Sequence, residues 1–341
     1  MVAGLREHTE VLQASTQNGF GMASTERSAV LGILCALAAT VFFSLNDLSI
    51  KFLSGDYPLH QIVFVRAAIA LLITLLIIMP LDGGLVALKT RRPMIHVLRG
   101  MCVVVANSAF FAAIAVMPLA NASAIFFVAP LFITGLSMLF LKEVVGFRRW
   151  AAVVVGLLGV VLVVRPTGAE FTAVMLLPVI AALAYAALQI LTRHTGMSER
   201  ASTMSFYIQL TFLLVTGGLA LALGDGRFAG SENEALEFFL RPWVMPPTID
   251  GLIMLALGGV SACAGYLISQ AYRGTDAGVV APYEYTTLLL AVFWGIMIWG
   301  EWPALSTWIG IVLIAGSGIF VALREAKLDA KPSAKWVAAR R

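Results

Sequence analysis

Long apolar runs separated by short polar breaks make up most of this chain. Each run approaches the roughly 20 apolar residues that a helix needs to cross the hydrocarbon core of a bilayer. The breaks carry charge, proline or glycine, as in Gly55-Asp56-Tyr57-Pro58. The expected spans are residues 30–50, 59–80, 95–117, 120–141, 149–165, 172–192, 201–223, 249–272, 277–299 and 304–323. The pattern predicts an all-α integral membrane protein with ten transmembrane helices.

Composition supports a membrane protein and excludes an ordinary soluble domain. Of the 341 residues, 60% are hydrophobic and 12% are charged, whereas a soluble domain has about 25% charged residues. The basic residues are scattered through short loops, so the net charge of +4 does not indicate nucleic-acid binding. Cys35, Cys102 and Cys263 lie in apolar runs without a CxxC pair, which favours buried free thiols over metal ligands. Residues 1–29 show no signal peptide.

The distribution of Lys and Arg predicts the orientation in the membrane. With the N-terminus in the cytoplasm, the inner segments hold 18 of the 23 basic residues. They are Arg6, Arg27, Lys89, Arg91, Arg92, Arg99, Lys142, Arg148, Arg149, Arg193, Arg200, Arg273, Arg324, Lys327, Lys331, Lys335, Arg340 and Arg341. The outer loops hold four, which are Lys51, Arg165, Arg227 and Arg241, and Arg66 lies inside a span. Positive residues favour the cytoplasmic side, so both termini are expected there.

The chain contains an internal repeat. A shift of 158 positions aligns residues 117–159 with 275–317 without a gap, so that Glu143 meets Glu301. Each unit has five spans, an odd number, so the second enters the membrane from the opposite side, as in many secondary transporters. The expected parts are a cytoplasmic segment 1–29, a five-helix repeat 30–165, a linker 166–171, a second five-helix repeat 172–323 and a basic cytoplasmic tail 324–341.

A looser match joins the first spans of the two repeats. With a shift of 142 positions, Asp47 meets Gln189 and Lys51 meets Arg193. The loop 224–248, which has glutamates among Phe and Leu, is expected to form a short helix on the membrane surface.

Several short motifs resemble the EamA-type members of the drug/metabolite transporter superfamily. They are Phe64-Val65-Arg66-Ala67, Leu139-Phe140-Leu141-Lys142-Glu143, Ala277-Gly278-Val279-Val280-Ala281 and Trp299-Gly300-Glu301. The resemblance covers about residues 30–323. It implies helices arranged around a central cavity, with spans five and ten at the periphery. Residues Ala281 to Thr286 are also similar to those of bacterial riboflavin importers and S-adenosylmethionine carriers of this family, which implies the bacterial inner membrane.

Glu284 is the strongest candidate for a functional residue. It lies about seven residues into span nine, between Tyr283 and Tyr285 and after Pro282, which frees a backbone carbonyl. A carboxylate in hydrocarbon is costly, so its default interpretation is functional. Glu284 is expected to bind a proton or a cationic or donor-rich substrate. The alternative is a structural role, with Glu284 paired to Tyr or Arg between two helices.

Asp47 and Arg66 are expected at similar depth in the outer third of the membrane. Asp47 is near the outer end of span one, and Arg66 is seven residues into span two. A structural ion pair is the favoured interpretation, since buried charges in membranes satisfy one another. The alternative is an outer gate that opens when substrate competes for one partner.

Other polar residues inside the spans are further candidates. Tyr185, Tyr266, Gln189 and Asn107 join Glu284, Tyr283 and Tyr285 as expected substrate-binding residues. Tyrosine in hydrocarbon needs a partner for its hydroxyl, and its ring can stack on a planar or cationic ligand. Hydrogen bonding between helices is the competing role for the amides. Glu143 and Glu301, at the ends of their spans, are expected to cap the following helix.

These features predict a secondary active transporter of a small metabolite. No nucleotide-binding loop is present, so coupling to a proton or to the solute gradient is expected, with no cofactor. The lead substrate is a planar aromatic metabolite such as riboflavin, taken up, and the alternative is S-adenosylmethionine or an amino-acid-type metabolite in either direction. A membrane enzyme would need acid–base or metal-binding residues gathered at one face. The histidines, His8, His60, His96 and His194, are isolated, so an enzyme is not expected.

Overall fold

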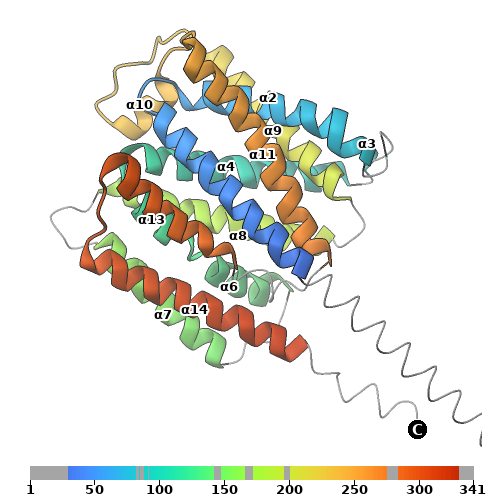
Figure 1. Cartoon of the computed structure of the whole chain (residues 1–341), viewed down its shortest axis with the longest axis vertical. Coiled ribbons are helices and arrows are strands. Elements are labelled where there is room, and N and C mark those ends of the chain that lie inside the picture. Colours follow the sequence, from blue (N-terminus) through green and yellow to red (C-terminus); the bar gives the residue numbers. More distant parts are fainter. Residues whose placement is uncertain are drawn as a thin grey trace, which may run out of the picture.

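The computed structural model describes residues 30–329 with gaps at 82–83, 85–87, 91, 142–146, 166–171, 196–199 and 275–282. The described residues form helices and no strand (Figure 1). A first helix, Val30–Leu53, is followed by α2 (Leu59–Ile73), η1 (Thr74–Ile78), α3 (Met79–Leu81), α4 (Pro93–Val116), α5 (Leu119–Phe126), α6 (Ala129–Leu141), α7 (Phe147–Val164), η3 (Ala173–Leu176), α8 (Leu177–Thr195), α9 (Ala201–Leu223), α10 (Glu234–Leu240), α11 (Thr248–Gly274), α13 (Thr286–Trp299) and α14 (Leu305–Asp329). The last helix thus runs six residues past the predicted span.

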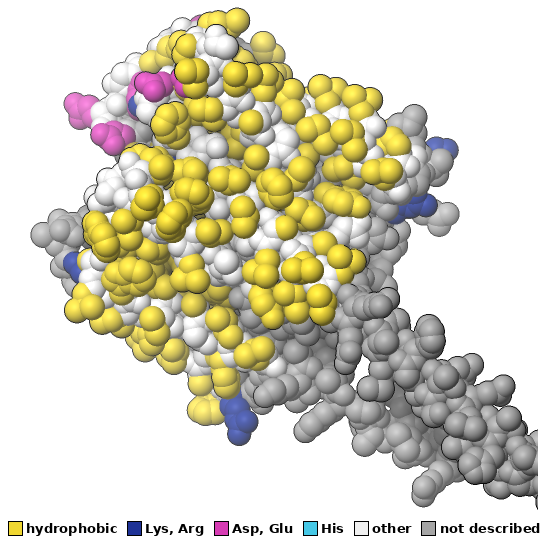
Figure 2. Space-filling model, in the orientation of Figure 1, with side chains coloured by type: hydrophobic (Ala, Val, Ile, Leu, Met, Phe, Trp, Pro, Cys, Tyr) yellow, Lys and Arg dark blue, Asp and Glu magenta, His cyan; other side chains and the backbone are white. Residues whose placement is uncertain are grey.

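The helices form a multi-pass membrane protein. Seven helical segments of the described chain are long and apolar enough to cross a membrane. Three shorter apolar helices, Trp150–Val164, Thr286–Trp299 and Leu305–Phe320, lie at the other expected positions. Hydrophobic side chains cover the middle of the face shown in Figure 2. Many large apolar side chains of the described residues are exposed, such as Leu221 at 88% and Val312 at 67%. A continuous apolar surface of this kind is what lipid tails contact.

The bundle has a main body and a peripheral pair of helices. In the main body α4 packs along α8, while α2 packs on α9 and α11. The peripheral pair is α7 and α14, which lie side by side at one edge of the molecule (Figure 1). This arrangement agrees with the expectation for spans five and ten.

Glycines allow α7 and α14 to approach closely. A Cβ atom added to Gly310 would lie 2.8 Å from the carbonyl oxygen of Gly159, and one added to Gly159 would lie 3.0 Å from the carbonyl oxygen of Gly310. The two backbones therefore touch directly. Gly156 faces Ser317, and Gly159 faces Ile314, so the two helices are antiparallel. Close contact through small residues is the usual way in which helices associate in a bilayer.

Two predicted spans are interrupted by a turn. In span four, α5 ends at Phe126, Phe127-Val128 forms a turn, and α6 begins at Ala129. In span nine, Tyr283 and Glu284 are helical, Tyr285 is a turn, and α13 follows. The opening of span nine, with Pro282, lies outside the described residues. Broken helices leave backbone groups without a helical partner near the middle of the membrane, where transporters place their binding sites.

One end of the bundle is covered by the loop 224–248, and this end is called the α10 face. The expected short helix is present as α10, with the Asn233 side chain accepting a hydrogen bond from the N–H of Leu236 at its start. Its position differs from the expectation of a helix on the membrane surface. The Phe238 side chain is 1% exposed and belongs to the main core, so α10 packs onto the ends of α2 and α4.

Hydrogen bonds fasten this loop to the turn after the first helix. Arg241 donates to the carbonyl oxygens of Ser54 (2.7 Å) and Gly55 (2.5 Å). The Gln61 side chain donates to the Val244 carbonyl and accepts from the Val244 N–H, at 2.6 and 3.0 Å. The α10 face is therefore tied across the two predicted repeats.

Candidate functional site

The two helix breaks meet inside the bundle. The rings of Phe127 and Tyr285, one from each break, have centroids 5.0 Å apart. Phe126 extends this contact on the other side, since its ring lies 5.6 Å from that of Tyr185 on α8 and 5.2 Å from that of Phe110 on α4. We call these five residues the aromatic cluster. It joins α4, α5, α8 and the break before α13.

Glu284 lies at the edge of the aromatic cluster. Its carboxylate is close enough to interact electrostatically with the side chains of Tyr185 and Tyr285. Gln189, one turn further along α8, lies near enough to Tyr185 to influence its hydroxyl group. Glu284, Tyr185 and Gln189 are all partly exposed rather than sealed in the core. The structure thus brings together three of the predicted binding residues. A carboxylate beside aromatic faces can bind a flat ligand that carries N–H or O–H donors or a positive charge.

The two tyrosines that flank Glu284 point to different neighbours. The Tyr285 side chain is 6% exposed and reaches α14, where a Cβ at Gly318 would overlap its hydroxyl group. That hydroxyl is buried and has no hydrogen-bond partner among the described residues. Tyr283 packs beside Ala36 and Ala271, between the first helix and α11. Tyr285 therefore supports the cluster from behind, and Tyr283 lies outside it.

A buried polar group next to the cluster contains Asp47 and Arg66, but not as a direct ion pair. Among the described residues, Arg66 donates to the Asn46 side-chain oxygen (3.2 Å), and Asn46 donates to Asp47 (3.1 Å). Ser261 on α11 also donates to Asn46 (3.0 Å). Asp47 and Arg66 attract one another electrostatically, and the hydrogen bonds that connect them pass through Asn46. Neighbours on a helix point about 100° apart, and the sequence does not fix which one faces the partner.

Arg66 connects this polar group to the aromatic cluster. Its guanidinium lies 4.9 Å from the ring centre of Phe212 and 5.5 Å from that of Phe111. Aromatic faces stabilise a buried cation where water is absent. The Phe111 ring in turn contacts Phe110 of the cluster, at 6.2 Å. The polar group and the aromatic cluster therefore form one continuous interior region.

The remaining predicted site residues are not brought into this region. Tyr266 packs with Ile73 and Ala262 in a small separate core between α2 and α11. Asn107 is half-buried on α4, one turn before Phe110 of the cluster. Glu143 lies outside the described residues. In the part of the chain that the structure describes, no group of three His, Cys, Asp or Glu side chains is suitable for a metal ion.

Sequence reasoning did not single out Phe126 and Phe127. The signal was present in the repeat, because the shift of 158 positions places Phe126 opposite Glu284 and Phe127 opposite Tyr285. Most aromatic residues of membrane helices serve packing, so neither stood out alone. The equivalence of Phe126 and Phe127 to Glu284 and Tyr285 in the repeat is the signal that identifies them as candidate site residues.

Comparison with known proteins supports the fold and decides the family. A solved structure superposes with a TM-score of 0.61 at 18% identity, over 88% of this chain and 99% of the solved one, which shows a shared fold. The model of the EamA-like transporter family matches residues 30–165. A riboflavin transporter of Rhizobium johnstonii is 30% identical over 318 residues, which are 93% of this chain and 99% of that protein. The chain belongs to the EamA-like transporter family.

A second relative in the EamA-like family has a different name. The S-adenosylmethionine uptake transporter of Rickettsia prowazekii is 26% identical over 296 residues, which are 87% of this chain and 94% of that protein. Both relatives match almost their whole length, so the likeness covers the site region and both predicted repeats. The predicted activity is confirmed at this level: this EamA-like protein is a metabolite transporter.

Proposed function

We propose that the chain spans the membrane ten times, as two inverted five-helix repeats at 30–165 and 172–323 with a linker at 166–171. The contact between α7 and α14 supports this. The 158-position shift carries Gly156 onto Ile314 and Gly159 onto Ser317, and the contacts Gly156–Ser317 and Gly159–Ile314 are exchanged by that operation. The same operation exchanges the partners of the Phe127–Tyr285 contact. Both contacts therefore lie on the pseudo-twofold axis that an inverted repeat requires.

We further propose that the protein lies in a bacterial inner membrane with segment 1–29 and tail 324–341 in the cytoplasm. The basic residues support this orientation, with 18 on the inner side and four on the outer side. The α10 face is then external. The acidic side chains visible in Figure 2 lie at this end of the molecule, near α10. The negative end is thus turned away from the cytoplasm.

The substrate that the site favours is a planar aromatic metabolite such as riboflavin, taken up into the cell. The observation that carries this proposal is the aromatic cluster at the two helix breaks, with the Glu284 carboxylate beside Tyr185. Phe126 and Phe127 are partly exposed and offer ring faces on which a flat ring system can stack. Glu284 and Gln189 supply acceptors for donors on the edge of the ligand. The named activity of the Rhizobium relative points in the same direction.

S-adenosylmethionine is the second candidate substrate because of its shape and charge. It combines a flat base with a positive charge, and a carboxylate next to aromatic faces suits both features. Glu284 is such a carboxylate, and the Rickettsia relative carries that name. Uncharged riboflavin needs Glu284 only as an acceptor, whereas a cationic substrate needs its charge. The two candidates therefore make different demands on the same residue.

The mode of transport is proposed to be secondary active, with the site opening to each side in turn. The chain contains no nucleotide-binding loop, so a proton or the solute gradient is the energy source considered. Glu284 is the candidate proton-binding residue, because it is a carboxylate in the interior of the bundle. The same chemistry gives no support for a membrane enzyme, since no group of three His, Cys, Asp or Glu side chains suited to a metal ion is found among the described residues.

Uptake into proteoliposomes tests this proposal. Labelled riboflavin and labelled S-adenosylmethionine are compared in vesicles containing the wild type, Phe127→Ala, Glu284→Gln or the control Glu234→Gln on exposed α10. We expect saturable riboflavin uptake that Phe127→Ala strongly reduces and the control leaves unchanged. Uptake of S-adenosylmethionine alone, abolished by Glu284→Gln, would select the second candidate. Uptake of neither compound by correctly folded wild type would overturn both assignments.

A further inference from the structure

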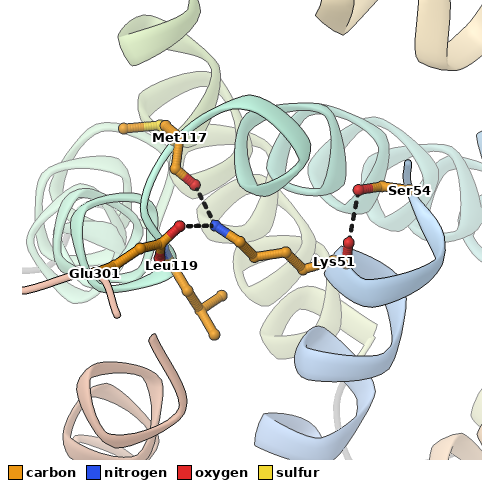
Figure 3. Close-up of polar contacts among 5 residues, drawn as sticks. All are labelled: Lys51, Ser54, Met117, Leu119 and Glu301. Atoms are coloured by element: carbon orange, nitrogen blue, oxygen red, sulfur yellow. Dashed lines mark hydrogen bonds and ion pairs between the residues drawn. The ribbon is translucent and has the colours of Figure 1, made fainter. Parts of the chain in front are cut away.

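An ion pair near the α10 face holds the start of α5. The Lys51 ammonium donates to the Glu301 carboxylate at 2.7 Å and to the Met117 carbonyl oxygen at 2.8 Å (Figure 3). The other Glu301 oxygen accepts from the backbone N–H of Leu119 at 3.1 Å. Leu119 is the first residue of α5, and Pro118 before it provides no side-chain cap. Glu301 was expected to cap the helix that follows it; it caps α5 instead.

Both partners are held in fixed positions. Gly300 adopts a left-handed conformation, with φ of 65°, and thereby ends α13. The N–H of Glu301 then bonds back to the Gly295 carbonyl at 3.0 Å, which directs the carboxylate towards α5. The Lys51 side chain is 8% exposed and lies 5.0 Å from the ring centre of Trp299. The contact therefore lies in the interior and is only weakly screened by solvent.

The ion pair and the candidate site lie at opposite ends of the short helix α5. Glu301 binds the N-terminus of α5, where the helix dipole favours a negative charge. The C-terminus of α5 is Phe126, followed by the break at Phe127. Eight residues of α-helix form a rigid rod of about 12 Å. A movement at Glu301 is therefore transmitted to the aromatic cluster.

The contact also joins the two predicted repeats. Lys51 and α5 belong to the first, and Glu301 belongs to the second. A second ion pair, Arg227–Asp225, is local, at 3.0 Å, and more than half exposed. Exposed pairs contribute little, whereas a buried pair is difficult to break unless another arrangement replaces it. A buried ion pair such as Lys51–Glu301 can thus be present in one conformation of the transporter and replaced by other contacts in a second conformation.

We propose that Lys51 and Glu301 are positioning residues that set α5 and close the transport path at the α10 face, and that their ion pair separates whenever the aromatic cluster opens to that face. The role rests on the proposed alternating transport, which it deepens by naming the contact that controls one of the two openings. A static role is the alternative, in which the pair only fastens helices and stays closed throughout the cycle.

Access to α5 from each side of the membrane separates these roles. Ser123, 2% exposed, lies on α5 between the ion pair and the break. Its replacement Ser123→Cys, with Cys35, Cys102 and Cys263 changed to Ser, gives a single thiol for a membrane-impermeant maleimide. Labelling rates are measured in right-side-out and inverted vesicles. The variants are Lys51→Met and Glu301→Gln, and the matched control is Asp225→Asn, which removes the exposed ion pair at the same end.

We expect both variants to raise the labelling rate roughly tenfold or more from one face only, because loss of the pair shifts the population towards the state that is open there. The control should match the unaltered single-thiol protein. Exchange of the charges, Lys51→Glu with Glu301→Lys, should partly restore slow labelling. Equal acceleration from both faces would indicate loosening of the fold, and unchanged rates would indicate a static pair. Either result overturns the proposal.

This labelling needs no substrate, so it stands apart from the assignment of riboflavin. If the wild type transports riboflavin, the two variants should lower its maximal rate and also its KM on the side that becomes accessible. A binding-competent state that is populated more often raises apparent affinity, while the cycle slows because closure is impaired. A lower rate with unchanged KM in both variants would contradict the positioning role even where labelling rises. Absence of riboflavin uptake together with one-sided labelling would overturn the assignment of riboflavin as substrate and leave the proposed role of the ion pair intact.

Discussion

The rings of Phe127 and Tyr285 lie 5.0 Å apart, and each residue marks the point where its own helix is interrupted. The two positions are equivalent in the internal repeat, so the contact joins corresponding points of the two halves. Phe126 and Glu284, which precede them, are equivalent as well, but one is apolar and the other is acidic. The site is therefore symmetric in its backbone and asymmetric in its chemistry.

Replacing Glu284 by Gln should leave the protein folded and inserted but strongly impair transport. The amide keeps the shape and hydrogen bonding of the carboxylate, and a neutral group costs less to bury, so stability should be equal or higher. If Glu284 carries the coupling proton, accumulation driven by a pH gradient is lost while exchange of labelled riboflavin persists. If Glu284 only binds substrate, both activities weaken together. Uptake and counterflow in proteoliposomes measure this, and wild-type values in both would make Glu284 structural.

Asn46 should matter more for stability than the charge of Asp47. Asn46→Ala leaves Arg66 and Ser261 without their acceptor, at a cost of about 1–3 kcal/mol. The coupling between Asp47→Asn and Arg66→Met, measured as a double-mutant cycle in thermal unfolding, should fall when Asn46 is absent. Ser49→Ala is the control, since that hydroxyl bonds only to the Leu45 carbonyl of its own helix. Coupling that is unchanged by Asn46→Ala would restore a direct Asp47–Arg66 interaction.

The contact between α7 and α14 should not tolerate a side chain at Gly310. The new Cβ of Gly310→Ala would collide with Val163 and with the Gly159 backbone, so we expect a loss of about 1–3 kcal/mol. Gly316→Ala, on the same helix, meets nothing within 4 Å and should be neutral or slightly stabilising. Thermal unfolding in detergent compares the two. Similar melting temperatures would mean that the helices are not packed this closely.

The hydrogen bond from the Tyr57 hydroxyl to Asp250, at 2.6 Å, should give a pH-dependent stability. This bond, helped by desolvation, raises the pKa of Tyr57 to about 12 from an ordinary value of 10.0. The folded state therefore retains the phenol proton where the unfolded chain loses it. The stability difference between wild type and Tyr57→Phe should be constant below pH 10 and shrink as the pH rises towards 12. A difference that does not change with pH in this range would contradict the bond.

Reporter fusions should place both ends of the chain in the cytoplasm and the α10 loop outside. A reporter that is active only in the periplasm should be inactive after Arg341 and active when inserted after Gly230, an exposed position in the loop 224–248. The prediction rests on the distribution of basic residues. Activity after Arg341 would invert the topology, and with it the side assigned to the α10 face.

Much of the architecture follows from the sequence, because apolar runs and the repeat are long-range signals that add over many residues. The helix positions follow from these signals, whereas the peripheral position of α7 and α14 was implied by the resemblance to the EamA-type family, and the two helix breaks were not predicted. The directions in which single side chains point do not follow from the apolar runs and the repeat. Tyr283 and Tyr285 contact different helices, because side chains two positions apart along a helical segment point about 200° apart.

Contacts between distant segments are the other part that the sequence does not supply. Lys51 and Glu301 are separated by 250 positions, and nothing in their local sequence names the other as partner. Glu301 follows a helix end, so local reasoning assigned it to the next helix. The three-dimensional path of the chain brings α5 to Glu301, and because Pro118 provides no side-chain cap, the Leu119 N–H bonds to the Glu301 carboxylate.

The backbone contact between Gly159 and Gly310 has a mechanical consequence. Where interlocking side chains join two helices, any sliding requires rotamer changes, and the helices keep one register. Here the backbones touch at Gly159 and Gly310, and the side chains of Val163 and Ile314 fit against these glycines, so α7 and α14 are held in one register. The α7–α14 pair is therefore suited to move as one rigid unit.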